Sequence, residues 1–138
     1  MTVVFTQGSL TAAMEDFLAD AAFPTLVVRL YKNNHTPTSA SILTDFTEAD
    51  FTSYADLGLP ISPTVGWDGT KVTATFPLLT WTTGDVTNLP QTIYGYVVWN
   101  TADSSVWWAE KFAVTPTALT LAGQTFQLTV VISDQNSP

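Results

Sequence analysis

Carboxylates are the side chains with the most chemical potential in this chain, which contains twelve Asp and Glu residues, one histidine and no cysteine. Asp45, Glu48 and Asp50 lie close together, and their oxygens could hold a hard cation such as calcium. The calcium-loop pattern D-x-[DN]-x-[DN]-G is absent, however, and carboxylates at the positive end of a helix explain the trio as well. We therefore expect no metal and no cofactor.

Residues for catalysis are few. His35 lies in the turn cluster NNHTPTSA and is expected to be an exposed loop residue without a set of partners. Glu110 projects onto an aromatic-rich face, where burial would raise its pKa, but the sequence places no second carboxylate opposite it. No nucleophile elbow, P-loop or dinucleotide fingerprint occurs. We expect Glu110 to be hydrogen-bonded structure and the chain not to be an enzyme.

Strands must position these residues, because short β-branched runs alternate with Gly, Pro and Asn turns along most of the chain. The runs at 25–33, 71–79 and 126–134 each predict a strand, and Pro77 places the second at a sheet edge or ends it there. The class expected is mainly β, as an antiparallel sandwich or barrel.

One or two short helices are expected beside the strands. Apolar residues recur at helical spacing over residues 9–23, before Pro24. In DFTEADFTSY, Thr47 is a candidate N-cap, with Phe46 and Phe51 as a hydrophobic staple. We expect residues 1–138 to form one β-rich domain, with a loose tail at 135–138.

The segment YGYVVWNTADSSVWWAEKF predicts a hairpin with large aromatic residues on both faces. Placing Asn100 opposite Ser105 puts Tyr94, Tyr96 and Val98 on one face with Trp107. Monomers rarely leave such an apolar face in water. The chain itself, another protein subunit or a sugar could cover it. We predict that these four residues form a partner interface, because Tyr and Trp are favoured interface anchors.

Composition limits the partners. The net charge is −8, and only four residues are Lys or Arg, so nucleic acid and anionic membranes are not expected as ligands. No basic region followed by an apolar run opens the chain, and no apolar run is long enough to span a membrane. We expect synthesis in a cytoplasm without processing. Charged residues are only 12% of the chain, which suits a protein packed against neighbours.

Three segments carry distinctive motifs in a fixed order. The segment from Val27 to Leu57 contains a strand-like run, an Asn-rich turn and the motif D-F-T-E-A-x-F-x-x-Y. IYGYVVWNTADSSVWWAEKF contains Y-G-Y and ends in W-A-E-x-F, and AGQTFQLTV follows near the end. In order and spacing these segments resemble a family of small structural proteins from the virions of tailed bacteriophages, which has Gly where this chain has Ser53 and more usually Asp where it has Gln124.

The resembling segments span roughly residues 26–132, most of the chain, and the resemblance transfers no catalytic residue. It implies a non-enzymatic virion part made in the host cytoplasm: a capsid decoration (cement) protein or a tail-associated one. Other virion proteins and further copies of the chain would be its partners. The alternative is a carbohydrate-binding module or receptor-reading fibre domain, with Trp67, Trp81 and Trp107 as candidates to stack on a sugar. A hydrolase that uses Glu110 is a third hypothesis.

Overall fold

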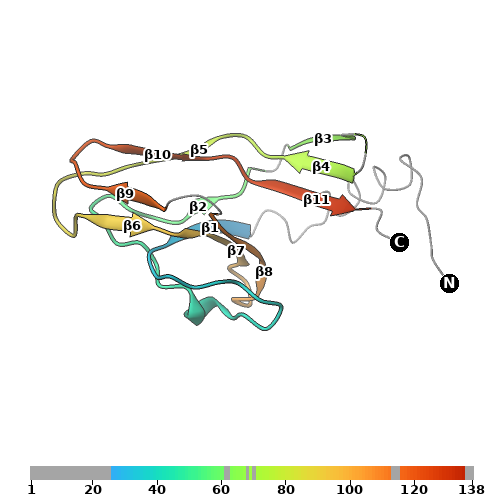
Figure 1. Cartoon of the computed structure of the whole chain (residues 1–138), viewed down its shortest axis with the longest axis horizontal. Coiled ribbons are helices and arrows are strands. Elements are labelled where there is room, and N and C mark those ends of the chain that lie inside the picture. Colours follow the sequence, from blue (N-terminus) through green and yellow to red (C-terminus); the bar gives the residue numbers. More distant parts are fainter. Residues whose placement is uncertain (1–25, 61–62, 68, 70, 113–115, 136–138) are drawn as a thin grey trace. The chain divides into compact units, whose positions relative to one another are not determined.

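Strands dominate the computed structural model, which describes residues 26–60, 63–67, 69, 71–112 and 116–135. In this part of the chain eleven strands occur together with one three-residue 3₁₀ turn (Figure 1). The mainly β prediction is therefore confirmed. The helix predicted at 9–23 lies outside the described residues. Of the predicted tail, Gln135 ends the last strand, and the remainder also lies outside.

Two compact units divide the chain. The minor unit contains a three-stranded antiparallel sheet in the order β11-β4-β3, formed by β3 (Thr64–Trp67), β4 (Lys71–Thr75) and β11 (Val131–Gln135). Strand β4 ends before Pro77, as predicted, because proline has no N–H to donate to a ladder. The single domain over 1–138 stays a prediction.

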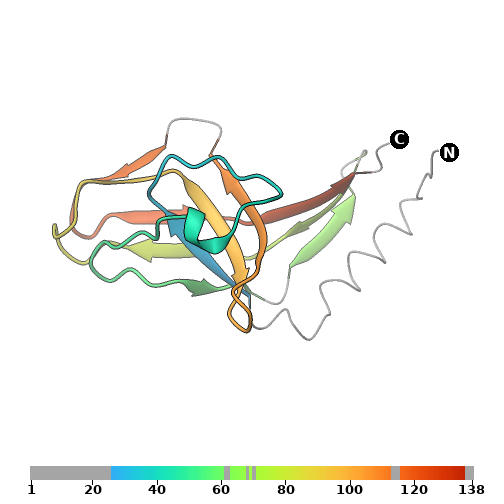
Figure 2. The same cartoon turned by 90° about the horizontal axis from the view of Figure 1, so that it is seen from below.

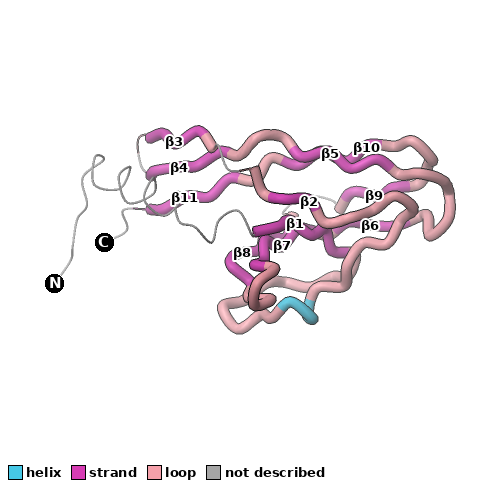
Figure 3. The backbone as a smooth tube through the Cα atoms, turned by 180° about the vertical axis from the view of Figure 1, so that it is seen from behind, coloured by secondary structure: helices cyan, strands magenta, loops and turns pink. Residues whose placement is uncertain are grey.

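The major unit comprises Thr25–Leu59 and Thr80–Gln127. Its largest sheet is antiparallel, in the order β2-β1-β7-β8, with bounds β1 (Leu26–Tyr31), β2 (Leu57–Gly58), β7 (Gly95–Asn100) and β8 (Val106–Lys111). Two strand pairs accompany it (Figure 3): β5 (Leu79–Thr82) with β10 (Thr125–Leu128), and β6 (Gln91–Ile93) with β9 (Thr117–Leu119). The strand predicted at 126–134 is thus two strands, β10 and β11.

One face of the four-stranded sheet packs against the β5–β10 pair. Val28 and Leu30 of β1 lie opposite Val98 and Tyr96 of β7, and all four side chains are buried. A row of rings then crosses to the second layer: Tyr96 to Phe112 at 6.4 Å between centroids, Phe112 to Phe126 at 5.9 Å, and Phe126 to Trp81 at 6.2 Å. This two-layer packing is that of a sandwich.

The helix predicted over 45–54 is wrong. Among the described residues only η2 (Leu43–Asp45) is helical, and the Ile42 N–H donates to Asp45 Oδ2 at 2.9 Å. Beyond it the chain is extended, since the Lys32 N–H donates to the Thr47 carbonyl at 2.8 Å. The Ala49 N–H likewise donates to the Leu30 carbonyl at 3.0 Å.

The segment after η2 therefore satisfies the edge of β1, whose backbone groups a helix at 45–54 would have left without these partners. Phe46 and Phe51 are both buried, as a hydrophobic staple would require, but they flank extended chain instead of a helix start. Figure 2 shows η2 in front of β1, so this segment covers the face of the sheet opposite the ring row.

Candidate partner-binding surface

The hairpin that carries the predicted interface has an irregular register. Asn100 and Ser105 are bonded across the turn as predicted, with the Asn100 N–H donating to the Ser105 carbonyl at 2.9 Å. Trp99 then pairs with Val106, but Val98 pairs with Trp108, so the register shifts by one residue at Trp107. Such a bulge re-aims the side chains beyond it.

The four predicted interface residues consequently do not share one exposed face. Tyr96 lies opposite Glu110 instead of Ala109. Tyr96 is 2% exposed and Val98 is fully buried within the chain, so the prediction that these two contact a partner is wrong for this conformation. Tyr94 and Trp107 are half-buried, and their contact with a partner stays a prediction.

The chain itself covers the second face of the hairpin. Tyr31, Phe46 and Val97 form a buried cluster there. Half-buried apolar side chains pack around this cluster, namely those of Leu43, Tyr94, Val106 and Ala109. The cover is an extended segment with a single helical turn. Of the three possible covers, the chain itself therefore shields this face, and the part of the hairpin that lacks a neighbouring strand among the described residues is the outer edge of β8.

Gly95 explains the Tyr-Gly-Tyr sequence. The Tyr31 side chain crosses β7 at this residue, and its hydroxyl donates to the His35 carbonyl at 3.2 Å. A Cβ added to Gly95 would lie 2.5 Å from Tyr31 Oη and would also meet the Glu110 carbonyl oxygen. Burial, assisted by the negative charge of Glu110, raises the pKa of Tyr31 to about 12.

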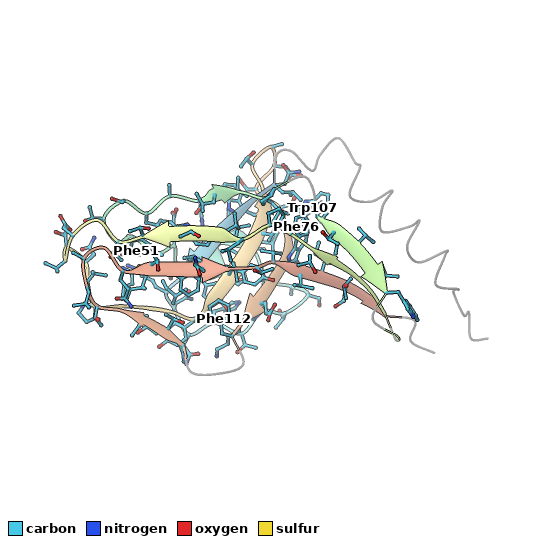
Figure 4. All side chains as sticks on the ribbon, turned by 90° about the horizontal axis from the view of Figure 1, so that it is seen from above. Phe51, Phe76, Trp107 and Phe112 are labelled. Carbon is cyan, nitrogen blue, oxygen red and sulfur yellow. The ribbon has the colours of Figure 1, made fainter. Side chains whose placement is uncertain are left out.

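Strand β8 is the edge of its sheet, and no described strand pairs with its outer side. Its residues from Val106 to Ala109 are all half-buried, and with the loop residues Pro37, Thr38, Ser39 and Ser41 they line a hollow of about 360 Å³. Figure 4 labels Trp107 near the start of β8 and Phe112 just beyond its end. An edge strand beside half-buried indoles is a candidate docking surface.

His35 is not the exposed loop residue predicted. It is half-buried, its ring meets Phe46 edge-on at 4.9 Å, and its Nε2 lies 3.1 Å from Ser41 Oγ. Ser41 Oγ also accepts the Thr38 N–H at 2.9 Å, and no carboxylate hydrogen-bonds the His35 ring in the described chain. These contacts fold the loop over β8.

Glu110 is exposed rather than buried among aromatics, but it is hydrogen-bonded as expected, since it accepts the Tyr96 hydroxyl at 3.2 Å. Burial and the charge of Glu110 raise the pKa of Tyr96, and the nearby indole N–H of Trp108 acts in the opposite direction. The buried indole N–H of Trp108 makes no hydrogen bond of ordinary geometry in the described chain.

Asp56 is the centre of a polar network that sequence reasoning missed. Its carboxylate accepts Arg29 Nε and Trp99 Nε1, each at 3.1 Å on Oδ2, and Tyr54 Oη at 2.8 Å on Oδ1. The Tyr54 hydroxyl in turn accepts the Leu30 N–H at 2.9 Å. Burial and Asp56 raise the pKa of Tyr54. The network ties the covering segment to β1 and β7.

The carboxylate trio considered for calcium separates onto different partners. Asp45 caps η2, Glu48 lies 3.7 Å from the Arg29 guanidinium, and Asp50 lies 2.8 Å from Lys32 Nζ. Among the described residues no group of three or more potential metal ligands occurs. Burial raises the pKa of Glu48, although the positive charge of Arg29 acts in the opposite direction. Arg29 lies closer to Asp56, at 3.1 Å, than to Glu48.

Asp50 instead belongs to a second hollow that sequence reasoning also missed. This hollow has a volume of about 520 Å³ and is lined by Lys32, Asp50, Asn88, Leu89, Pro90, Gln91, Thr92 and Tyr94. Its polar residues come from distant parts of the chain, so no local pattern could have announced it. The aromatic residue Tyr94, which is half-buried, was the one available signal.

Of the three tryptophans proposed to stack on sugar, Trp81 is excluded. It is 4% exposed, and its Nε1 donates to the Ala55 carbonyl at 2.9 Å in the core. Trp67, in the minor unit, and Trp107 are half-buried.

The described part of the chain contains no helix with the length and apolar character that a membrane span requires.

Comparison of the chain with protein-family models, with curated proteins and with solved structures found no match. The resemblance to bacteriophage virion proteins therefore stays a prediction.

Proposed function

We propose that this chain is a non-enzymatic structural protein of a tailed-bacteriophage virion, either a capsid decoration protein or a tail-associated one. It acts by packing against other virion proteins and further copies of itself, after synthesis in the host cytoplasm. The observation that carries the proposal is the outer edge of β8, where half-buried Trp107 and Trp108 lie beside a hollow. Edge backbone groups and indole rings together suit the addition of a partner strand.

Charge and sequence resemblance support the same role. A net charge of −8 suits an outer position, away from packaged DNA. The resembling segments correspond to β1, the segment that covers the hairpin, the β7–β8 hairpin and β10. The resemblance thus follows the elements that build the docking edge, and includes the left-handed residue Ser53, with φ 76°, where the family has Gly.

The test uses particles purified from a phage that encodes this chain, in which mass spectrometry should find it in many copies. A Trp107→Ser variant should be incorporated at least several-fold less, because the indole is the proposed anchor. Val86→Ser is the matched control, since Val86 is 65% exposed on a loop and should tolerate the change. Particles without the chain, or equal incorporation of both variants, would refute the proposal.

Sedimentation of the purified chain addresses self-association separately. At tens of micromolar we expect concentration-dependent association that Trp107→Ser weakens and Val86→Ser leaves unchanged. A monomer at every concentration would remove the homo-oligomer from the proposal and leave binding to a different virion protein.

A further inference from the structure

The hollow beside Tyr94 joins charged, amide and apolar groups from four parts of the major unit. Lys32 follows β1, Asp50 belongs to the segment that covers the sheet, and Asn88 to Pro90 form the turn before β6. Gln91 and Thr92 of β6 complete the wall with Tyr94. The hollow has a volume of about 520 Å³ and opens widely to solvent, so a ligand there would lie along the surface.

Hydrogen bonds hold the Asp50 carboxylate in one position. Oδ1 accepts Lys32 Nζ at 2.8 Å and Gln91 Nε2 at 2.6 Å. The Asp50 N–H donates to Gln91 Oε1 at 3.0 Å, while the Asp50 carbonyl accepts Asn88 Nδ2, also at 3.0 Å. Gln91 is only 6% exposed, so it is a rigid support rather than a surface side chain.

The other oxygen of Asp50 is available to a ligand. Its side chain is 53% exposed, and no described residue donates a hydrogen bond to Oδ2. The hydrogen bond from Lys32 lowers the pKa of Asp50, so the carboxylate is ionised and accepts hydrogen bonds at neutral pH. Lys32, 30% exposed, supplies donors next to this acceptor.

Tyr94 adds an aromatic wall. The half-buried Tyr94 packs against the cluster of Tyr31, Phe46 and Val97, and it lines the hollow together with Leu89 and Pro90. These groups suit a pyranose ring. The hydroxyls of a pyranose donate and accept hydrogen bonds, so they can bind both the carboxylate and the ammonium, and its C–H face can pack on the aromatic ring.

We propose that this hollow binds a neutral sugar residue, with Asp50 and Lys32 hydrogen-bonding neighbouring hydroxyls and Tyr94 stacking on the ring. An anionic ligand is disfavoured by the net charge of −8 and by the available carboxylate oxygen. A metal cation is disfavoured by the Lys32 ammonium 2.8 Å from the only carboxylate in the wall. The inference goes beyond packing, because it gives the protein a glycan ligand at a site separate from the β8 edge.

The adjoining surface indicates that the ligand is longer than one sugar. A further hollow of about 540 Å³ shares Lys32 and Asp50 and continues along the covering segment from Thr47 to Phe51, and to Tyr54. The ion pair thus borders both hollows, and an oligosaccharide that crosses it would contact both. Neutral oligosaccharides are accordingly the right probe.

The experiment begins with the full chain on an array of neutral oligosaccharides built from glucose, galactose, mannose and N-acetylhexosamines. The strongest hit is then titrated by calorimetry. Asp50→Asn should weaken binding by roughly tenfold or more, because it removes the charged acceptor, and Tyr94→Ala by a similar factor, because it removes the stacking ring. Tyr94→Phe should retain binding, because it keeps the ring.

Leu121→Ser is the control, since Leu121 is 66% exposed, does not line this hollow and should leave the affinity unchanged. Amide shifts in the wild-type protein locate the ligand independently of any variant. We expect shifts at Asp50, Gln91 and Tyr94, and none at 106–109. No binding to any neutral oligosaccharide at millimolar concentration, or shifts and losses confined to β8, would overturn the proposal.

Discussion

Replacing Gly95 with alanine should destabilise the fold by about 3 kcal/mol, because the packing of Tyr31 across β7 leaves no room for a methyl group. The new Cβ would lie 2.5 Å from Tyr31 Oη and 2.7 Å from Tyr31 Cζ, and against the backbone carbonyl of Glu110. Contacts this short must be relieved by movement.

Two movements could relieve the clash, and their costs are similar. If Tyr31 swings out, a ring that is fully buried becomes exposed, which costs about 1.5 to 3 kcal/mol. If β8 separates from β7, backbone hydrogen bonds near Gly95 weaken, and each contributes about 1 kcal/mol. One of them is the hydrogen bond from the Phe112 N–H to the Tyr94 carbonyl. The packing of the rings is lost as well. Either route gives about 2 to 3 kcal/mol.

Urea unfolding followed by tryptophan fluorescence measures this change, and Gly58→Ala is the matched control. Gly58 is also a strand residue, but an added Cβ there meets nothing within 4 Å. That variant should be unchanged or more stable by about 0.5 kcal/mol, because the unfolded chain loses freedom. If Gly95→Ala proves as stable as Gly58→Ala, the packing of Tyr31 over Gly95 is wrong.

Two other predictions concern the single residues Ser53 and Asp56, and a third concerns the tyrosines whose pKa values are raised. Ser53→Gly should stabilise the protein by about 0.5 to 1 kcal/mol and Ser53→Ala should not, because Ser53 has φ 76°, where side chains are strained; thermal unfolding of both variants decides it. Asp56→Asn should cost about 2 kcal/mol in urea unfolding, because one amide oxygen cannot replace a carboxylate with three donors; a cost below about 0.5 kcal/mol would contradict the network. Stability should also fall as pH rises above about 10. The pKa values of Tyr31, Tyr54 and Tyr96 are raised on folding, so the unfolded chain releases these protons first. Unfolding free energies that stay flat from pH 10 to 12, while tyrosinate absorbance rises, would refute this.

The strand framework was predictable because alternation of side chains is a local property. The alternation from Leu26 to Leu30 predicted a strand, and β1 indeed buries Leu26, Val28 and Leu30 on one face. Pro77 ended its strand for an equally local reason, the missing N–H. The hairpin turn placed Asn100 opposite Ser105 because the turn residues between them are few and polar.

The failed helix at 45–54 shows where local patterns are insufficient. Thr47 with Asp50 is a sound helix-start pattern, but the edge of β1 needs backbone partners and takes them from residues 47 and 49. The bulge at Trp107 was equally hidden, since alternation continues through it unchanged.

The sequence by itself determined a mainly β chain and a hairpin with apolar side chains on both faces, because side-chain alternation and turn chemistry act between near neighbours. Only the tertiary structure decided what shields that hairpin. Tyr96 and Val98 are buried by the chain, and the groups that hold Asp56 and Asp50 come from segments far apart in sequence. Such contacts depend on how the strands pair and pack, which no local spacing of residues specifies.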